Sequence, residues 1–183
     1  MPRRGLDERA VSYAARVTDL PLLRGYSETT LAPVRELLAR GGLGAHMAAR
    51  YPDVHAVTTN ELLHTYVHDL RQRHLKTAPK PARVLYDERL VADERALGLH
   101  TFKSRSHGAK LRALSEIRIA GVFRRAAPEF LRMIVVHELA HLREFEHNKA
   151  FYRLCESMEP DYHQLEFDLR LWLTARELEE TKP

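Results

Sequence analysis

Residues 127–142 read Ala-Pro-Glu-Phe-Leu-Arg-Met-Ile-Val-Val-His-Glu-Leu-Ala-His-Leu, an apolar run with polar residues set into it. Proline is favoured at the first position of a helix and an acidic residue suits the first turn, so we expect a helix to begin at Ala127-Pro128-Glu129. The apolar residues that follow predict a helix that is largely buried. Two histidines and a glutamate on such a helix would each lose hydration unless another group satisfied them.

The polar residues in this run have the HExxH arrangement, with His137 and His141 four positions apart and Glu138 after the first. On a helix, positions i and i+4 lie about 40° apart around the axis and roughly 6 Å along it, so both imidazoles can reach one metal ion. The carboxylate of Glu138 would lie beside that ion and take a proton from water. The pattern therefore predicts two metal ligands and a general base.

A third histidine, His147, follows six positions after His141. If the same helix continued, His147 would lie about 9 Å further along the axis, too far away to share the ion. Asn148 is a favourable N-cap residue, which predicts a turn after Leu142 and a new helix after Asn148. That turn would return His147 to the ion as third ligand, and Glu156 on the new helix is the alternative. Three protein ligands leave a coordination position of zinc open for water.

Upstream of this region the chain reads as helical. The spacing of apolar residues predicts a helix over 28–38 and a second one that begins at Thr59 or Asn60 and runs toward Leu75. Residues 76–81 then contain two prolines, which exclude helix.

We place a boundary at this break, between an N-terminal helical part, residues 1–80, and a catalytic part, residues 81–183. Alternating apolar residues in the catalytic part predict short strands, and capping signals predict further helices. The predicted strands are 82–86, 97–102 and 114–122, with a turn at 106–109, and the further helices are 148–157 and 162–180. The expected fold class is α+β, with a small antiparallel-rich sheet packed on the HExxH helix and an N-terminal helical extension.

The composition is that of a globular protein, with 44% hydrophobic and 30% charged residues among 183. Cys155 is the single cysteine, which excludes an intrachain disulfide, and no apolar run reaches the roughly 18–20 residues that span a bilayer. The N-terminus lacks the apolar segment of a signal peptide, so we expect a cytoplasmic protein without membrane contact. The net charge of +4 permits an acidic partner, but the basic residues are spread out and do not indicate nucleic-acid binding. The oligomeric state is not predicted.

Residues 134–152, Ile-Val-Val-His-Glu-Leu-Ala-His-Leu-Arg-Glu-Phe-Glu-His-Asn-Lys-Ala-Phe-Tyr, are followed by Met-Glu-Pro-Asp-Tyr at 158–162. Together these stretches resemble the YgjP-like metallopeptidases, which are zincins described broadly as metal-dependent hydrolases. The resemblance also includes residues 114–119 and 127–131, so that it covers about residues 80–175.

The resemblance implies that the metal ligands are His137, His141 and His147 and that Glu138 is the general base. We therefore expect a metallopeptidase that binds one zinc ion and hydrolyses peptide bonds in a peptide or protein substrate. The alternatives are a hydrolase of a small molecule such as a nucleotide phosphoanhydride, a DNA-associated protease, or a non-enzymatic adaptor with structural zinc. For the small-molecule alternative, the basic residues that could hold phosphates are Arg105, Lys110 and Arg118.

Tyr162 and His163 are candidates for contacts to substrate. In zincin chemistry a tyrosine or histidine often steadies the oxyanion of the tetrahedral intermediate. The simpler interpretation is that Tyr162 packs in the core and that His163 lies at the start of a helix.

Overall fold

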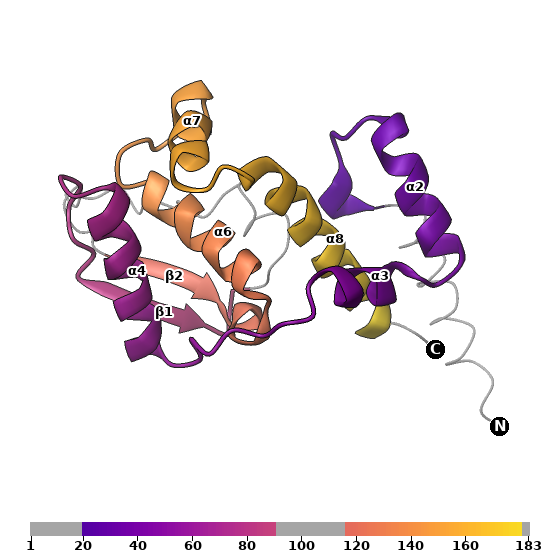
Figure 1. Cartoon of the computed structure of the whole chain (residues 1–183), viewed down its shortest axis with the longest axis horizontal. Coiled ribbons are helices and arrows are strands. Elements are labelled where there is room, and N and C mark those ends of the chain that lie inside the picture. The colour runs from indigo at the N-terminus through magenta and orange to yellow at the C-terminus, as the bar shows by residue number, and fades with distance from the viewer. Residues whose placement is uncertain (1–19, 91–115, 181–183) are drawn as a thin grey trace. The chain divides into compact units, whose positions relative to one another are not determined.

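The structure, a computed structural model, describes residues 20–90 and 116–180 (Figure 1). The chain divides into two compact units, one formed by residues 1–52 and 167–183 and the other by residues 53–166. The boundary predicted between residues 80 and 81 lies inside the second unit and stays a prediction. Among the described residues, no helix combines the length and the apolar character that crossing a membrane requires.

The first unit is helical. Ser27 caps the helix α2 (Glu28–Ala39) by accepting a hydrogen bond from the amide of Thr30 at 3.2 Å. Gly41 ends this helix in the left-handed conformation with a φ of 63°, which glycine adopts without a steric penalty. The other elements of the unit are the 3-10 helix η1 (Pro21–Leu23), α3 (Leu43–Arg50) and the part of α8 (Tyr162–Glu180) from residue 167 onward. The predicted helix over 28–38 is confirmed, whereas α3 was not predicted.

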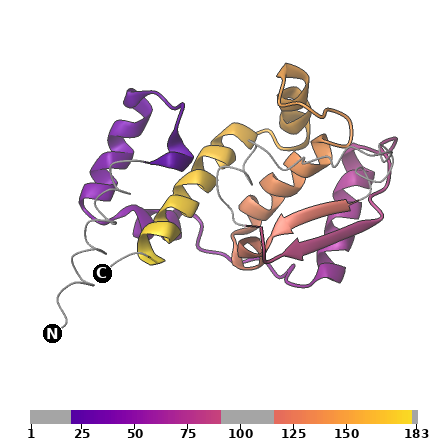
Figure 2. The same ribbon diagram turned by 180° about the vertical axis from the view of Figure 1, so that it is seen from behind.

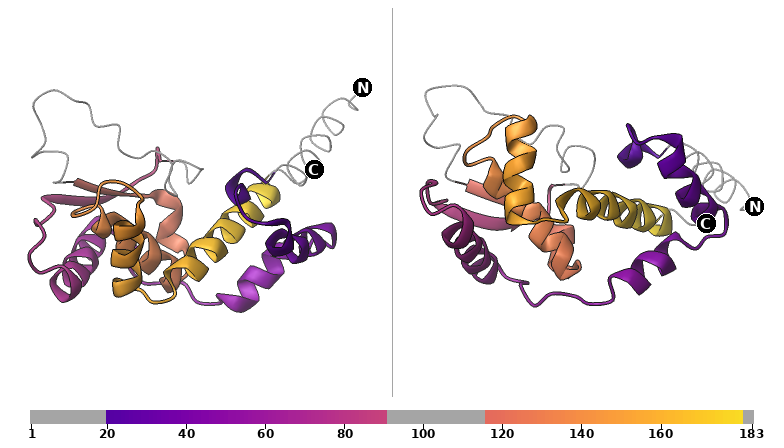
Figure 3. Two further views of the ribbon diagram at one scale, coloured as in Figure 1. Left: turned by 90° about the horizontal axis from the view of Figure 1, so that it is seen from above. Right: turned by 45° about the horizontal axis from the view of Figure 1, so that its top comes forward.

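In the residues that the structure describes, the second unit packs helices on a sheet of two strands. Its elements are α4 (Asn60–His74), β1 (Arg83–Asp87), β2 (Glu116–Ala120), the 3-10 helix η3 (Gly121–Arg125), α6 (Pro128–Ala140), α7 (Lys149–Met158) and the first turn of α8. Helix α4 contacts β1 and α6 contacts β2, so both helices cover the same face of the sheet (Figure 2). Helix α7 packs against α6 (Figure 3). Helix α6, which carries the HExxH residues, thus lies between the sheet and α7.

The sheet face that α4 and α6 cover is apolar. Val84 pairs with Ile117 and Tyr86 with Ile119, and all four side chains are buried. Arg118 points to the opposite face and is 43% exposed. The alternation of apolar residues that predicted a strand over 114–122 is therefore present in β2, where Ile117 and Ile119 are buried and Arg118 faces outward.

The α+β class is confirmed, but the expectation of an antiparallel-rich sheet is wrong for the described residues, because β1 and β2 pair in parallel. Two adjacent parallel strands need a long connection to return the chain to the same end of the sheet, and residues 88–115 separate β1 from β2 here. Alternation of apolar residues identifies a strand but not the direction of its partner. The predicted strand 97–102 and the turn at 106–109 lie outside the described residues.

Candidate metal centre

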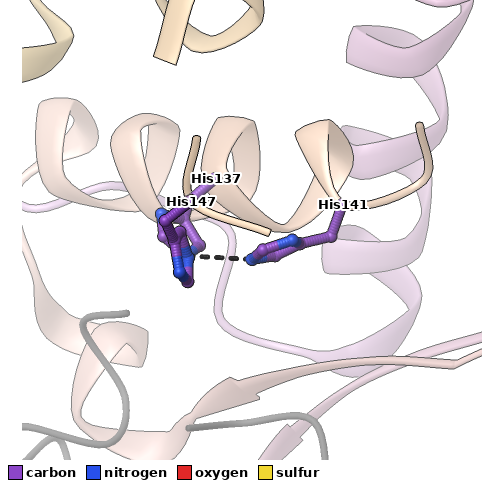
Figure 4. A group of neighbouring side chains, drawn as sticks. All are labelled: His137, His141 and His147. Atoms are coloured by element: carbon purple, nitrogen blue, oxygen red, sulfur yellow. Dashed lines mark hydrogen bonds between the residues drawn. The ribbon is translucent and has the colours of Figure 1, made fainter. Parts of the chain in front are cut away.

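His137 and His141 lie at the C-terminal end of α6, as the HExxH spacing predicted. His137 is in the last turn of the helix and His141 is its C-cap residue. Both side chains are nearly fully buried, at 5% and 4% exposure, and their Nε2 atoms are 3.3 Å apart (Figure 4). The C-terminal end of α6 therefore brings the Nε2 atoms of His137 and His141 next to each other.

A tight turn brings the third histidine back to this point. The amides of Arg143 and Glu144 both donate to the carbonyl of Ala140, at 3.0 and 2.9 Å, and end α6. After the turn, the Nε2 atom of His147 lies 3.1 Å from that of His137 (Figure 4). The turn predicted between Leu142 and His147 is thus confirmed.

Asn148 begins the next helix immediately after His147. Its Oδ1 accepts hydrogen bonds from the amides of Ala150 at 2.8 Å and Phe151 at 3.0 Å, which confirms the predicted N-cap of α7. The cap fixes the direction in which the chain leaves His147. The position of the third imidazole therefore depends on a local hydrogen-bonding pattern that is visible in the sequence.

The three imidazoles have a geometry that could hold a metal ion. One ligand nitrogen from each ring lies within 4.8 Å of the other two. A tetrahedral ion with ligand distances of about 2.0–2.1 Å separates its ligand atoms by about 3.3 Å, which matches the shorter spacings here. The Nδ1 atom of His141 lies 3.0 Å from the carbonyl oxygen of Glu144, which only accepts hydrogen bonds, so the neutral ring carries its proton there. A lone pair on Nε2 then points at the other rings, where it could bind a cation.

Burial favours the neutral, ligating form of these rings. Loss of solvent lowers the pKa of His141 to about 4, and it also lowers the pKa of His147 below the usual value. A histidine must be unprotonated at the nitrogen that binds a metal. The site is therefore ready to bind a cation at neutral pH.

Glu138 follows His137 on α6 and is partly exposed. Loss of solvent around its carboxyl group raises the pKa of Glu138 to about 7. A divalent cation in the site would lower this pKa, because it favours the charged carboxylate. With a cation in the site, the side chain would therefore be a charged carboxylate at neutral pH, which can accept a proton from water.

Two aromatic side chains behind the cluster were not predicted to support it. Phe151 is fully buried, and the centroid of its ring lies 5.0, 4.6 and 4.7 Å from those of His137, His141 and His147. Tyr162 is also fully buried, and its hydroxyl lies 2.7 Å from Nδ1 of His137. The sequence signal for Phe151 was its place three residues after the cap Asn148, on the side of α7 that faces inward.

Helix α7 is held against α6 by a pair of side chains near its C-terminal end. The guanidinium of Arg132 donates to the carbonyl of Met158 at 2.8 Å and to the carboxylate of Glu159. This contact joins α7 to α6 at the end of α7 that lies away from Asn148.

The remaining candidates lie away from the three converging nitrogens. His163 is exposed and pairs with Glu156, with Nε2 and Oε1 3.2 Å apart, so that neither joins the imidazole cluster. Arg118 already binds two carboxylates, Asp87 at 2.9 Å and Glu116 at 3.1 Å. The other two predicted phosphate contacts, Arg105 and Lys110, lie outside the described residues.

The chain is similar to known proteins. The YgjP-like, metallopeptidase domain family matches residues 44–171. The chain is also similar to a UTP pyrophosphatase from Escherichia coli (strain K12), with 52% identity over 166 residues, which are 91% of this chain and 99% of that relative. No solved structure matches the chain. The chain therefore belongs to the YgjP-like metallopeptidase-domain family and is a metal-dependent hydrolase.

Proposed function

We propose that this chain hydrolyses a phosphoanhydride bond of a nucleoside triphosphate, with UTP as the first substrate to test. The observation that carries the proposal is the convergence of three imidazole nitrogens, at 3.1 and 3.3 Å, at the end of helix α6, which also carries the carboxylate of Glu138. The choice of substrate rests on the 52% identity to a UTP pyrophosphatase, which extends over nearly the whole of both chains.

In this proposal His137, His141 and His147 hold one zinc ion, and Glu138 is the catalytic base. Three neutral nitrogen ligands suit zinc, and manganese, iron, cobalt and nickel are the alternatives to test. When bound, the ion polarises a phosphoryl oxygen and lowers the pKa of a water molecule.

Glu138 accepts a proton as the water oxygen forms a bond to the α-phosphorus of UTP. The bond from that phosphorus to the bridging oxygen breaks, and the proton passes to the departing pyrophosphate, so the products are UMP and pyrophosphate. The burial of His137 and His141 limits the water around the reacting atoms, which strengthens electrostatic interactions there.

The test is to incubate the zinc-loaded protein with UTP and to separate the nucleotide products by ion-exchange chromatography. We expect UMP and pyrophosphate from the wild type and a large loss of both with Glu138→Gln or His137→Ala. The variant His46→Ala is the matched control, because His46 is an exposed histidine on α3. Release of UDP and inorganic phosphate, or no turnover of UTP by the wild type, would contradict the proposal.

Peptide hydrolysis is the second candidate function, and the family's description as a metallopeptidase domain favours it. The same geometry, a carboxylate one position after the first ligand, can deprotonate water for attack on a peptide carbonyl. The same protein preparations should therefore be incubated with a library of peptides. Cleavage that needs Glu138, in the absence of UTP hydrolysis, would assign this function instead.

A further inference from the structure

The hydroxyl of Tyr162 lies behind the proposed metal centre, where the rest of the mechanism gives it no role. Tyr162 is the first residue of α8, and its side chain is 0% exposed. The hydroxyl oxygen is 2.7 Å from Nδ1 of His137, the ring nitrogen that faces away from the other two imidazoles. It also forms a hydrogen bond with the thiol of the buried Cys155 on α7.

These two contacts allow the direction of hydrogen bonds that metal binding by His137 requires. A neutral imidazole carries one proton, and the nitrogen without it is the one that can bind a metal ion. If Nδ1 of His137 donates to the oxygen of Tyr162, the tyrosine proton needs another acceptor, and the sulfur of Cys155 is in place to accept it. The chain His137 to Tyr162 to Cys155 thus leaves a lone pair on Nε2 of His137, which points toward His141 and His147.

We propose that Tyr162 is a positioning residue that holds His137 in the orientation and tautomer needed for metal binding. It acts through His137 and does not touch the substrate, in contrast to the oxyanion contact that the sequence suggested. This inference rests on the proposed metal centre but not on the choice between nucleotide and peptide substrates. Groups that hold the second nitrogen of a metal-binding histidine typically change metal affinity by about 10–100-fold.

The test is the affinity of the full chain for Zn²⁺, measured by competition with a chromophoric chelator after the protein has been stripped of metal. Tyr162→Phe keeps the ring and removes the hydroxyl, and we expect it to bind Zn²⁺ about 10–100-fold more weakly than the wild type. The matched control is Tyr86→Phe in the same unit, which also removes a buried hydroxyl, one that donates to the carbonyl of Val57 at 2.6 Å. Tyr86→Phe should bind Zn²⁺ with the wild-type affinity.

The two variants separate a positioning role from a purely structural one. Both should unfold at a lower denaturant concentration than the wild type in the presence of a chelator, but only Tyr162→Phe should show weaker Zn²⁺ binding. Equal Zn²⁺ affinities for the two variants would overturn the inference. A wild type that binds no Zn²⁺ would instead refute the metal centre, which makes the two failures distinguishable.

A second pair of variants covers the case in which Tyr162→Phe does not fold. Cys155→Ser keeps an acceptor for the tyrosine proton, whereas Cys155→Ala removes it. We expect Cys155→Ala to bind Zn²⁺ more weakly than Cys155→Ser. If both substitutions leave the same Zn²⁺ affinity, the hydrogen-bonded chain does not orient His137.

Discussion

His141 illustrates the chemistry of the site at the scale of a residue, because its two ring nitrogens have opposite surroundings. Nδ1 faces the carbonyl of Glu144 at 3.0 Å, and Nε2 faces the ring of His137 at 3.3 Å. A neutral ring that donates from Nδ1 directs the lone pair of Nε2 at its neighbour, and a cation held between the two nitrogens would be bound by that lone pair. The surroundings of His141 therefore suit metal binding, as the spacing of the rings does.

Glu138 is proposed as the catalytic base and not as a metal ligand, so its substitution should lower turnover without a change in metal binding. Glu138→Gln keeps the size of the side chain but cannot accept a proton, so we expect turnover to fall by about 10²–10⁴-fold. The affinity for Zn²⁺, measured by chelator competition, should stay at the wild-type value because the carboxylate is not a ligand. A variant that retains wild-type turnover would show that another group takes the proton.

At the scale of an element, helix α7 positions the third ligand through its N-terminus. The side chain of Asn148 caps this helix, and the buried Phe151 in its first turn packs against all three imidazoles. Because His147 directly precedes the cap, a change in the first turn of α7 must also move His147.

Removal of this cap should therefore affect both stability and metal binding. Asn148→Ala should reduce the free energy of unfolding by about 1 kcal/mol, the usual contribution of an N-cap, and should weaken Zn²⁺ binding. The control is Thr59→Ala, because Thr59 caps α4 through a hydrogen bond from the amide of Leu62 at 3.3 Å. Thr59→Ala should lower stability by a similar amount without a change in Zn²⁺ affinity. Equal effects of both variants on Zn²⁺ affinity would show that the cap of α7 does not position His147.

At the scale of the whole molecule, the ion pairs around Asp87 connect the end of β1 with the middle of β2 and should affect acid stability. Hydrogen bonds from Arg89, and then from Arg118, lower the pKa of Asp87 to about 2. An aspartate in an unfolded chain has a pKa of about 3.9, so the unfolded chain takes up this proton first as the pH falls. The stabilisation is therefore present above about pH 4 and is lost between about pH 4 and pH 2.

Denaturant unfolding across this pH range checks the effect. Asp87→Asn should be less stable than the wild type at neutral pH, and its free energy of unfolding should change less between pH 4 and pH 2. Asp53→Asn is the control, because Asp53 is exposed in the same unit. If Asp87→Asn has the same pH dependence as Asp53→Asn, the ion pairs do not contribute to acid stability.

Features that depend on neighbouring residues were predictable from the sequence, and features that depend on distant ones were not. The positions where α4, α6 and α7 begin follow from Thr59, Pro128 and Asn148, because each of these residues acts on the first turn of its helix. Helix α3 was missed because only Leu43 and Met47 are buried on it, too few for a periodic pattern.

The parallel pairing of β1 with β2 depends on the path of residues 88–115, which strand patterns do not specify. The same limit applies to the candidate site. The ligands were predictable because HExxH and the cap at Asn148 are local patterns. The hydroxyl of Tyr162 reaches His137 only in the folded chain, and no spacing in the sequence encodes a contact across 25 positions.

The most direct test of the central claim is the metal content of the purified protein, measured by inductively coupled plasma mass spectrometry on the wild type, His147→Ala and His46→Ala. If three imidazoles hold one ion, the wild type and His46→Ala should each contain one equivalent of metal after dialysis, and His147→Ala should lose most of it. A full equivalent of metal in His147→Ala would contradict the claim, because it would mean that the ion is held without the third imidazole.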